Sequence, residues 1–198
     1  MNQICYNFVL PEVTFKTRTR VNNDTENPFV WKDMTTSDYF KGKKCVLFSL
    51  PGAFTPTCSS SHLPGYEKYY EQFKKMGIDE VYCLSVNDAF VMRKWGLDQG
   101  LEEDMTPGSL GFKKVKLIPD GTCNFTRGVG MSCTWEKERG FGERSWRYSA
   151  FVVDGVVKKV FIEEPFVQDS KEDPFKVSNA ETMLSFLESQ LNLTPIQL

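Results

Sequence analysis

Two short apolar runs, separated by a helical pattern, most constrain the fold of this chain. The run "KCVLFSL" covers residues 44–50 and ends at Pro51-Gly52, and "DEVYCLSV" covers residues 79–86. Neither run alternates between apolar and polar residues, which predicts strands that are buried on both faces. Between them, apolar residues recur at helical spacing from Ser59 to Gly77, and Pro64 is expected to bend this helix early. Strand, helix and strand in this order predict two parallel strands joined by a right-handed crossover.

The second half of the chain predicts further strands and a closing helix. A helix is expected to start at Asn87-Asp88, and "KKVKLIP" (residues 113–119) to form a strand. Two β-branched and aromatic runs flank Asp154-Gly155, the strongest short-range signal for a hairpin. The last amphipathic pattern predicts a C-terminal helix through Ala180, Met183, Leu184, Leu187 and Leu191. Together these elements predict an α/β chain with a thioredoxin-like fold, in which helices flank a central mixed β-sheet.

Composition limits the size and the partners of the protein. The 198 residues, 40% of them hydrophobic, can bury one core, so we expect residues 1–198 to form a single domain. The 24 basic and 26 acidic residues leave a net charge of −2, which gives no electrostatic reason to expect nucleic acid or an anionic membrane as partner. No apolar stretch approaches the roughly 20 residues of a membrane span, and "MNQICYNFVL" lacks the features of a secretion signal. These features predict a cytoplasmic protein.

The cysteines indicate chemistry rather than a disulfide framework or a metal site. A cytoplasmic protein keeps its thiols reduced, so we expect any disulfide to be transient. The chain has no C-x-x-C motif and a single histidine, His62, so we expect no structural zinc, and no sequence feature calls for a cofactor. The six cysteines are Cys5, Cys45, Cys58, Cys83, Cys123 and Cys133.

Cys58 occupies the position with the most chemical meaning. It follows a predicted buried strand and falls in the first turn of a predicted helix. Backbone N–H groups have no helical partner there and the helix dipole is positive, so the site favours a thiolate over a thiol. The alternative is that Cys58 is a small buried hydrophobic residue, as many free cysteines are.

The residues before Cys58 favour the chemical interpretation. The Thr55 hydroxyl can donate one hydrogen bond and accept others across a tight loop. Pro51 and Pro56 stiffen that loop. An ordinary turn with a capping threonine would need neither the two prolines nor the cysteine.

These residues carry a resemblance to a known family. The segment "PGAFTPTC" (residues 51–58) matches the P-x-x-x-T-x-x-C signature of the peroxiredoxins. The segments "WRYSAFVVDGVVKKVFIEEP" and "DPFKVSNAETMLSFL" are similar to the type II, or peroxiredoxin 5, subfamily, particularly its bacterial members. The resemblance extends from about residue 10 to residue 187. It implies a thiol-dependent peroxidase of hydrogen peroxide and alkyl hydroperoxides, active in antioxidant defence and redox homeostasis.

The resemblance also implies a role for each matching residue. Cys58 corresponds to the peroxidatic cysteine, which becomes a sulfenic acid, and Thr55 to the threonine that hydrogen-bonds the peroxide and the thiolate. Pro51 corresponds to the proline that shields the pocket, and Arg147 to the arginine beside the sulfur. Because side chains alternate along a strand, Arg144 is expected to point away from the face of Arg147, as a residue that supports the site at one remove.

How the sulfenic acid is reduced stays open between two routes. Cys83, on the adjacent predicted strand, matches a cysteine that acts as a resolver in some plant members, but its neighbours make it look like a core residue. The working hypothesis is a one-cysteine cycle in which glutaredoxin with glutathione, or thioredoxin, supplies the thiol. Cys123 and Cys133 match no cysteine of the family. The resemblance further implies a homodimer.

Two other functions have to be weighed. His62 lies four residues after Cys58, which invites a Cys–His nucleophile pair of the protease kind. No residue that would orient the histidine is evident, so a structural hydrogen bond is the preferred interpretation. The second alternative is a thioredoxin-like redox sensor or binding module that uses Cys58 to pass oxidation to a partner protein.

Overall fold

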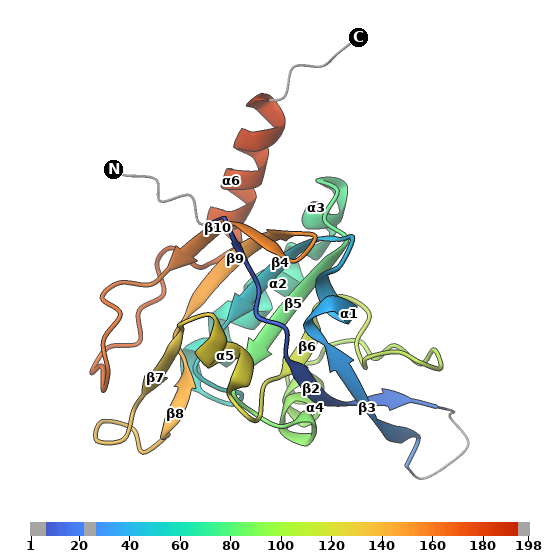
Figure 1. The fold of residues 1–198 in the computed structure, drawn as a ribbon, viewed down its shortest axis with the longest axis horizontal. Coiled ribbons are helices and arrows are strands. Elements are labelled where there is room, and N and C mark those ends of the chain that lie inside the picture. Colours follow the sequence, from blue (N-terminus) through green and yellow to red (C-terminus); the bar gives the residue numbers. More distant parts are fainter. Residues whose placement is uncertain (1–6, 22–26, 194–198) are drawn as a thin grey trace.

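A six-stranded mixed sheet forms the centre of the molecule (Figure 1). The structure is a computed structural model that describes residues 7–21 and 27–193, with side chains as far as residue 190. In spatial order the strands of the sheet are β1 (Phe8–Val9), β10 (Val156–Ile162), β9 (Tyr148–Val153), β4 (Lys44–Ser49), β5 (Glu80–Ser85) and β6 (Lys116–Pro119).

The pairing of these strands confirms the predicted topology. β4, β5 and β6 run parallel, with Phe48 opposite Cys83, whereas β9, β10 and β1 pair in antiparallel fashion. The predicted buried runs are β4 and β5, in which all but the first residue of each strand are buried. Asp154 and Gly155 join β9 to β10 and both have positive φ, 49° and 73°. Such a pair of left-handed residues is what a two-residue hairpin requires.

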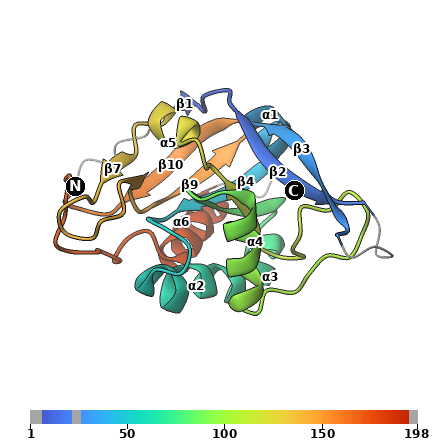
Figure 2. The same ribbon diagram turned by 90° about the horizontal axis from the view of Figure 1, so that it is seen from below.

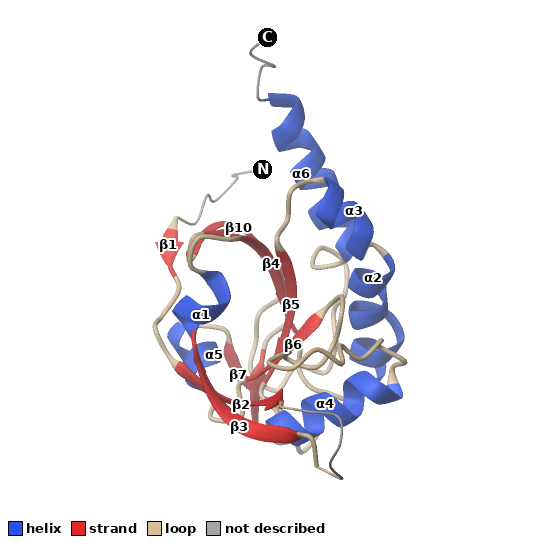
Figure 3. Ribbon diagram, turned by 90° about the vertical axis from the view of Figure 1, so that its right-hand side faces the viewer, coloured by secondary structure: helices blue, strands red, loops and turns tan. Residues whose placement is uncertain are grey.

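Helices cover both faces of the sheet (Figure 3). On one face lie α2 (Leu63–Lys68), α3 (Tyr70–Lys75), α4 (Ala89–Asp98) and α6 (Ala180–Leu193). On the other face lie the short helices α1 (Thr36–Phe40) and α5 (Asn124–Gly128). Figure 2 shows the same layers from below. A separate apolar cluster lies between each face of the sheet and the helices that cover it. Cys58 and Cys83 both belong to the cluster between the sheet and helices α2 and α6.

Local signals placed two of these helices correctly. α4 starts at the predicted residue, because the Asp88 side chain accepts hydrogen bonds from the N–H groups of Phe90 and Val91. The predicted C-terminal helix is α6, in which Ala180, Met183, Leu184 and Leu187 are buried. The side chain of Leu191 lies outside the described residues.

The helix that follows Cys58 differs from the prediction. Instead of one bent helix, the chain forms a π-helical turn, η1 (Cys58–His62), and then α2 and α3, which are separated at Tyr69. The Leu63 N–H donates to the Cys58 carbonyl, five residues back, which defines the π turn. Pro64 lies in the first turn of α2, where a missing N–H costs nothing. The widened turn therefore lies at Cys58 itself, ahead of the expected bend at Pro64.

Two hairpins outside the main sheet were not predicted. The first pairs β2 (Thr14–Arg20) with β3 (Phe29–Thr35), and the second pairs β7 (Ser132–Thr134) with β8 (Glu143–Ser145). β2 is a polar strand of sequence "TFKTRTR", and β7 and β8 are three residues each. These three strands therefore carry no apolar run that would mark them in the sequence.

No helix in the described part of the chain has the length and hydropathy that a membrane span requires. That residues 1–198 form a single domain stays a prediction.

Candidate active site

Cys58 is placed by the end of β4 and by the turn that follows it. It is the first residue of η1, and its side chain is completely buried. The Ser59 N–H donates to the Thr55 carbonyl at 3.1 Å, so the helical bonds begin one residue after Cys58. The Cys58 N–H thus belongs to the first turn, where no helical carbonyl is available and the positive end of the helix dipole faces the sulfur.

Arg147 approaches the sulfur from the central sheet. It immediately precedes β9, which lies beside β4, and only 1% of its surface is exposed. Its Nη1 lies 3.5 Å from the Cys58 Sγ and donates to it. Because arginine keeps its charge at any ordinary pH, the Cys58 sulfur lies in hydrogen-bond contact with a permanent buried cation.

His62 supports this arginine from η1. Its Nε2 lies 3.1 Å from the Ser178 carbonyl oxygen, which can only accept, so Nε2 carries the proton. Its Nδ1 lies 3.2 Å from the Arg147 Nη1, which can only donate. Burial, together with the neighbouring charge of Arg147, holds the pKa of His62 well below its usual range. The ring is therefore neutral and acts as an acceptor for Arg147, with its two nitrogens engaged by Ser178 and Arg147.

Asp173 completes the surroundings of Arg147, and sequence reasoning missed it. It lies between β10 and α6, and its Oδ1 accepts a hydrogen bond from the Arg147 Nη2. Burial disfavours the charge on Arg147, but the Cys58 sulfur and the Asp173 carboxylate raise the pKa of the guanidinium above its ordinary value. No motif marks Asp173, because an isolated aspartate in a loop has no pattern that distinguishes it.

Thr55 and Pro51 lie in the loop that leads to Cys58. The Thr55 hydroxyl donates its proton to the Gly52 carbonyl at 2.8 Å. With that proton in use, Thr55 presents oxygen lone pairs to the site, whereas the sequence suggested a donor and acceptor in one. The loop is held to the end of β5 by the Ala53 N–H, which donates to the Asn87 Oδ1 at 3.0 Å.

A narrow crevice borders on this loop. Pro51 and Thr55 line it on one side and Trp135, Phe141 and Asp173 on the other. Its free volume of about 20 Å³ suits one water-sized molecule. The sulfur itself is covered, so a peroxide that enters by this crevice has to displace part of the loop or of the opposite wall.

The remaining sequence candidates lie outside this arrangement. Cys83 lies on β5 within the same apolar cluster, and burial together with the nearby Cys58 raises the pKa of its thiol well above the usual range. Arg144 lies on β8, where its Nη1 donates to the Val86 carbonyl at 2.7 Å and its guanidinium lies over Phe141. Arg144 thus supports the end of β5 rather than the sulfur.

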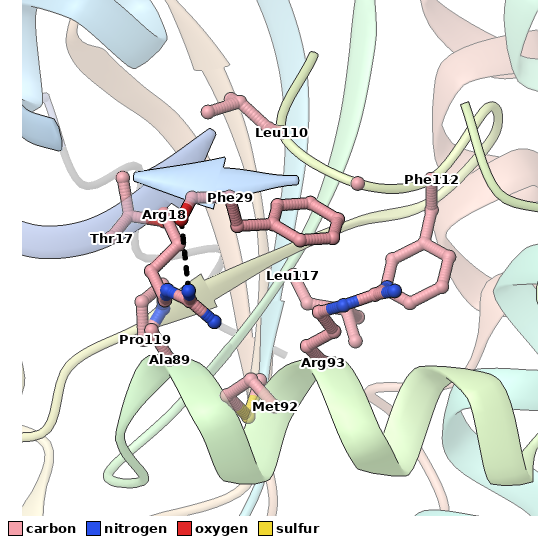
Figure 4. A pocket seen from close by; sticks show the side chains of 11 residues that line it. Thr17, Arg18, Phe29, Ala89, Met92, Arg93, Leu110, Phe112, Leu117 and Pro119 are labelled. Atoms are coloured by element: carbon pink, nitrogen blue, oxygen red, sulfur yellow. Dashed lines mark hydrogen bonds between the residues drawn. The ribbon is translucent and has the colours of Figure 1, made fainter. Parts of the chain in front are cut away.

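A second cavity, between the β2–β3 hairpin and α4, contains none of these residues (Figure 4). Arg18 and Arg93 flank the Phe29 ring there, with their guanidinium carbons 5.6 and 4.2 Å from its centre. The cavity holds about 20 Å³ of free space, and Thr17 supplies the one hydroxyl among its lining residues, with no thiol, histidine or carboxylate beside it. We interpret this cavity as a small gap in the packing of the β2–β3 hairpin against α4.

Cys5 lies outside the described residues, and the other five cysteines are free thiols. Burial raises the pKa of Cys45 and of Cys133 to about 12 and that of Cys123 to about 11. Of the described thiols, Cys58 is the one with a buried cation within hydrogen-bond distance.

Comparisons with known proteins bear on this arrangement. A family model described as Redoxin matches residues 30–184. A peroxiredoxin of Synechocystis sp. is 52% identical over 180 residues, which cover 90% of this chain and 89% of that protein.

Solved structures give the same picture. An antioxidant protein of Plasmodium falciparum, described as a 1-Cys peroxiredoxin, has a TM-score of 0.81 at 31% identity, over 92% of this chain and 99% of that one. Reduced Prx3 of Vibrio vulnificus in complex with hydrogen peroxide has a TM-score of 0.74 at 35% identity, over 96% of this chain and 99% of that one.

Proposed function

Because the chain belongs to the redoxin family, as a peroxiredoxin, we propose that Cys58 is its peroxidatic cysteine and that Arg147, Thr55 and Pro51 complete the site. The resemblance seen in the sequence is confirmed, and so are the thioredoxin-like fold and the enzyme class. The protein is a thiol-dependent peroxidase, an oxidoreductase of antioxidant defence. The observation that carries the assignment of the site is the 3.5 Å contact between the Cys58 Sγ and the Arg147 Nη1, both of them buried.

The proposed reaction transfers one oxygen atom from the peroxide to the sulfur. The Cys58 thiolate attacks the terminal oxygen in line with the O–O bond, an S–O bond forms and the O–O bond breaks. Negative charge then develops on the departing oxygen, which takes up a proton and leaves as water or an alcohol, while Cys58 becomes a sulfenic acid. Donors placed in advance around this charge lower the barrier, because they stabilise the transition state more than the ground state.

Each residue has a distinct part in this reaction. Arg147 stabilises the thiolate before the attack and the departing oxygen during it. The Cys58 N–H, at the start of the helix, adds a second donor. Thr55 accepts a hydrogen bond from the peroxide O–H, since its own proton is engaged by Gly52. Pro51 is buried beside them and keeps water away from the sulfur.

The reductant is proposed to be an external thiol, supplied by glutaredoxin with glutathione or by thioredoxin. Burial and a raised pKa keep the Cys83 thiol protonated, which supports a one-cysteine cycle over resolution by Cys83. The similar Plasmodium falciparum protein is a 1-Cys peroxiredoxin, which supports the same cycle. An NADPH-coupled assay that compares the two reductants tests the proposal, and turnover with neither of them contradicts it.

A homodimer is proposed because large apolar side chains lie exposed, one of them in the loop before Cys58 and two on the β2–β3 hairpin and α4. Phe54, in the loop before Cys58, is 51% exposed, and Trp31 and Phe90 are 59% and 54% exposed. The last two rings pack edge to face, 5.4 Å apart. Sedimentation of the wild type and of Phe90→Ser tests this proposal, and a monomer at micromolar concentration would contradict it.

We also propose that the protein acts in the cytoplasm, where thiols stay reduced, because its described cysteines are free. Fractionation of cells that express the full chain tests this location.

The assignment of the site is tested with Cys58→Ser. The variant should consume no hydrogen peroxide in the coupled assay, whereas Cys123→Ser should consume it as the wild type does. Full peroxidase activity in Cys58→Ser would contradict the assignment. Oxidation of the wild type at the rate of free cysteine would leave only a redox-sensing module.

A further inference from the structure

The segment between β10 and α6 brings two side chains to the buried arginine. It runs from residue 163 to residue 179 beside the β7–β8 hairpin (Figures 1 and 2). Asp173 pairs with the Arg147 Nη2, and the guanidinium carbon lies 5.7 Å from the centre of the Phe175 ring. The side chain of Asp173 is 21% exposed and that of Arg147 is 1% exposed, so the carboxylate covers the outer end of the guanidinium.

A buried carboxylate fixes the end of this segment. Glu163, the residue after β10, is 1% exposed, and its Oε1 accepts hydrogen bonds from the N–H groups of Lys176, Val177 and Ser178 at 2.8–2.9 Å. The Ser178 hydroxyl donates to the same oxygen at 2.8 Å. The Ser178 carbonyl, directed by this turn, is the acceptor for the His62 Nε2. The segment therefore holds both His62 and Arg147.

The β7–β8 hairpin fixes the other end. The Trp135 Nε1 donates to the Ser170 carbonyl at 3.1 Å, and the Asp169 N–H donates to the Thr134 carbonyl at 2.8 Å. The Lys137 N–H donates to the Asp169 Oδ1 at 2.9 Å. Asp173 thus lies on a segment that is anchored on both sides, which makes the position of its carboxylate definite before any substrate arrives.

The charges around Arg147 indicate what this carboxylate does. Among the described residues, Asp173 is the one carboxylate within ion-pair distance of Arg147, and His62 is neutral. The other anion is the Cys58 thiolate, whose charge disappears when the sulfur becomes a sulfenic acid. A buried cation without a partner is strongly unfavourable. The pair with Asp173 is what remains to hold Arg147 in place at that stage.

We propose that Asp173 is a positioning residue, whose carboxylate keeps the Arg147 guanidinium directed at Cys58 in every redox state of the sulfur. The inference rests on the proposed roles of Cys58 and Arg147. It adds a residue that touches neither the peroxide nor the sulfur and acts through Arg147. The hydrogen bond to Nη2 fixes the plane of the guanidinium, so that Nη1 stays on the side of the sulfur and of His62.

Three variants separate this role from a general effect on the segment. Asp173→Ala removes both the charge and the hydrogen bond, and Asp173→Asn removes the charge but keeps an oxygen acceptor for Nη2. Glu172→Ala, at the neighbouring exposed position, removes a carboxylate from the same segment and serves as the matched control. Stopped-flow tryptophan fluorescence gives the rate constant for oxidation by hydrogen peroxide.

The positioning role predicts that Asp173→Ala slows oxidation roughly 10- to 100-fold, the effect of a misplaced catalytic group. Asp173→Asn should recover most of the rate, and Glu172→Ala should match the wild type. If the wild type reacts much faster than free cysteine and Asp173→Ala reacts equally fast, the inference is overturned. It is also overturned if Glu172→Ala loses as much of the oxidation rate as Asp173→Ala does. A wild type that reacted at the rate of free cysteine would instead overturn the proposed site, and the inference with it.

A double-mutant cycle tests the dependence on redox state. Cys58→Ser replaces the thiolate by a neutral group, as oxidation does, so Arg147 then depends on Asp173 alone. Asp173→Asn should therefore lower the melting temperature more in the Cys58→Ser background than in the reduced wild type. Equal losses in the two backgrounds would overturn the inference. This measurement needs no activity and stands even if Asp173→Ala fails to fold.

Discussion

The Arg147 Nη1 lies 3.5 Å from the Cys58 Sγ, although 89 positions separate the two residues in the sequence. The pairing of β4 with β9 creates this contact, because Cys58 follows β4 and Arg147 precedes β9. The contact therefore depends on the register of the sheet, and it supplies the positive charge that a reactive sulfur needs.

Replacing this arginine should slow the reaction while leaving the fold intact. Arg147→Lys keeps a positive charge but lacks the planar guanidinium, whose Nη1 faces the sulfur and His62 while Nη2 faces Asp173. We therefore expect oxidation by hydrogen peroxide to slow by about 100-fold, the usual effect of losing one transition-state donor. Stopped-flow fluorescence measures the rate. Arg144→Lys, in which the lysine can still reach the Val86 carbonyl, should react nearly as fast as the wild type, and an equal loss in both variants would contradict the role of Arg147.

Thr55 should act through its acceptor oxygen. Thr55→Val removes the hydroxyl at almost constant volume, and Thr55→Ser keeps it. We expect Thr55→Val to lower kcat/KM for hydrogen peroxide about tenfold, which corresponds to one hydrogen bond of about 1.4 kcal/mol. Thr55→Ser should stay close to the wild type. Identical losses in both variants would show that the methyl group matters instead of the oxygen.

The pH dependence of stability should report on His62, the single histidine of the chain. Its pKa is lowered in the folded protein by burial and by Arg147, so below about pH 6.5 the unfolded chain binds a proton that the folded chain does not. The free energy of unfolding therefore keeps its full value above about pH 6.5. Below that pH it decreases by up to about 1.4 kcal/mol per pH unit.

Urea unfolding at pH 7.0 and pH 5.5 measures this loss. His62→Gln cannot titrate and should lose less stability between the two values than the wild type does. Parallel curves for the two proteins would contradict a neutral, buried His62.

Cys83 should be dispensable for turnover. Its buried thiol has a raised pKa and no thiolate with which to attack the sulfenic acid. Cys83→Ser should therefore keep both the first oxidation and steady-state turnover with a glutaredoxin system. Loss of turnover with the first oxidation intact would establish Cys83 as the resolving residue and refute the one-cysteine cycle.

The sequence predicted those features that depend on local patterns. The buried runs, the Asp154-Gly155 hairpin and the Asp88 cap are specified by neighbouring residues, and the structure confirms them. The approach of Arg147 to Cys58 was expected from the resemblance. Alternation along one strand was expected to set Arg144 apart from Arg147, but Arg144 lies on β8 and Arg147 precedes β9, so that alternation does not relate the two residues.

Other features depend on distant groups that no local pattern reports. The π turn shifts His62 relative to Cys58, and its role as an acceptor follows from the Ser178 carbonyl, 116 positions away. Asp173 reaches Arg147 because a long irregular segment is fixed by Glu163 and by Trp135. Similarly, the Thr55 hydroxyl donates its proton to the Gly52 carbonyl and therefore not to the peroxide.

The central claim is that the environment of Cys58 makes this sulfur react with peroxide. Its most direct test is the second-order rate constant for oxidation of the reduced wild type by hydrogen peroxide at pH 7, followed by tryptophan fluorescence, with mass spectrometry to locate the added oxygen. The account predicts oxidation at Cys58 at least about 100-fold faster than that of free cysteine. Oxidation at the rate of free cysteine, or first at another cysteine, would contradict it.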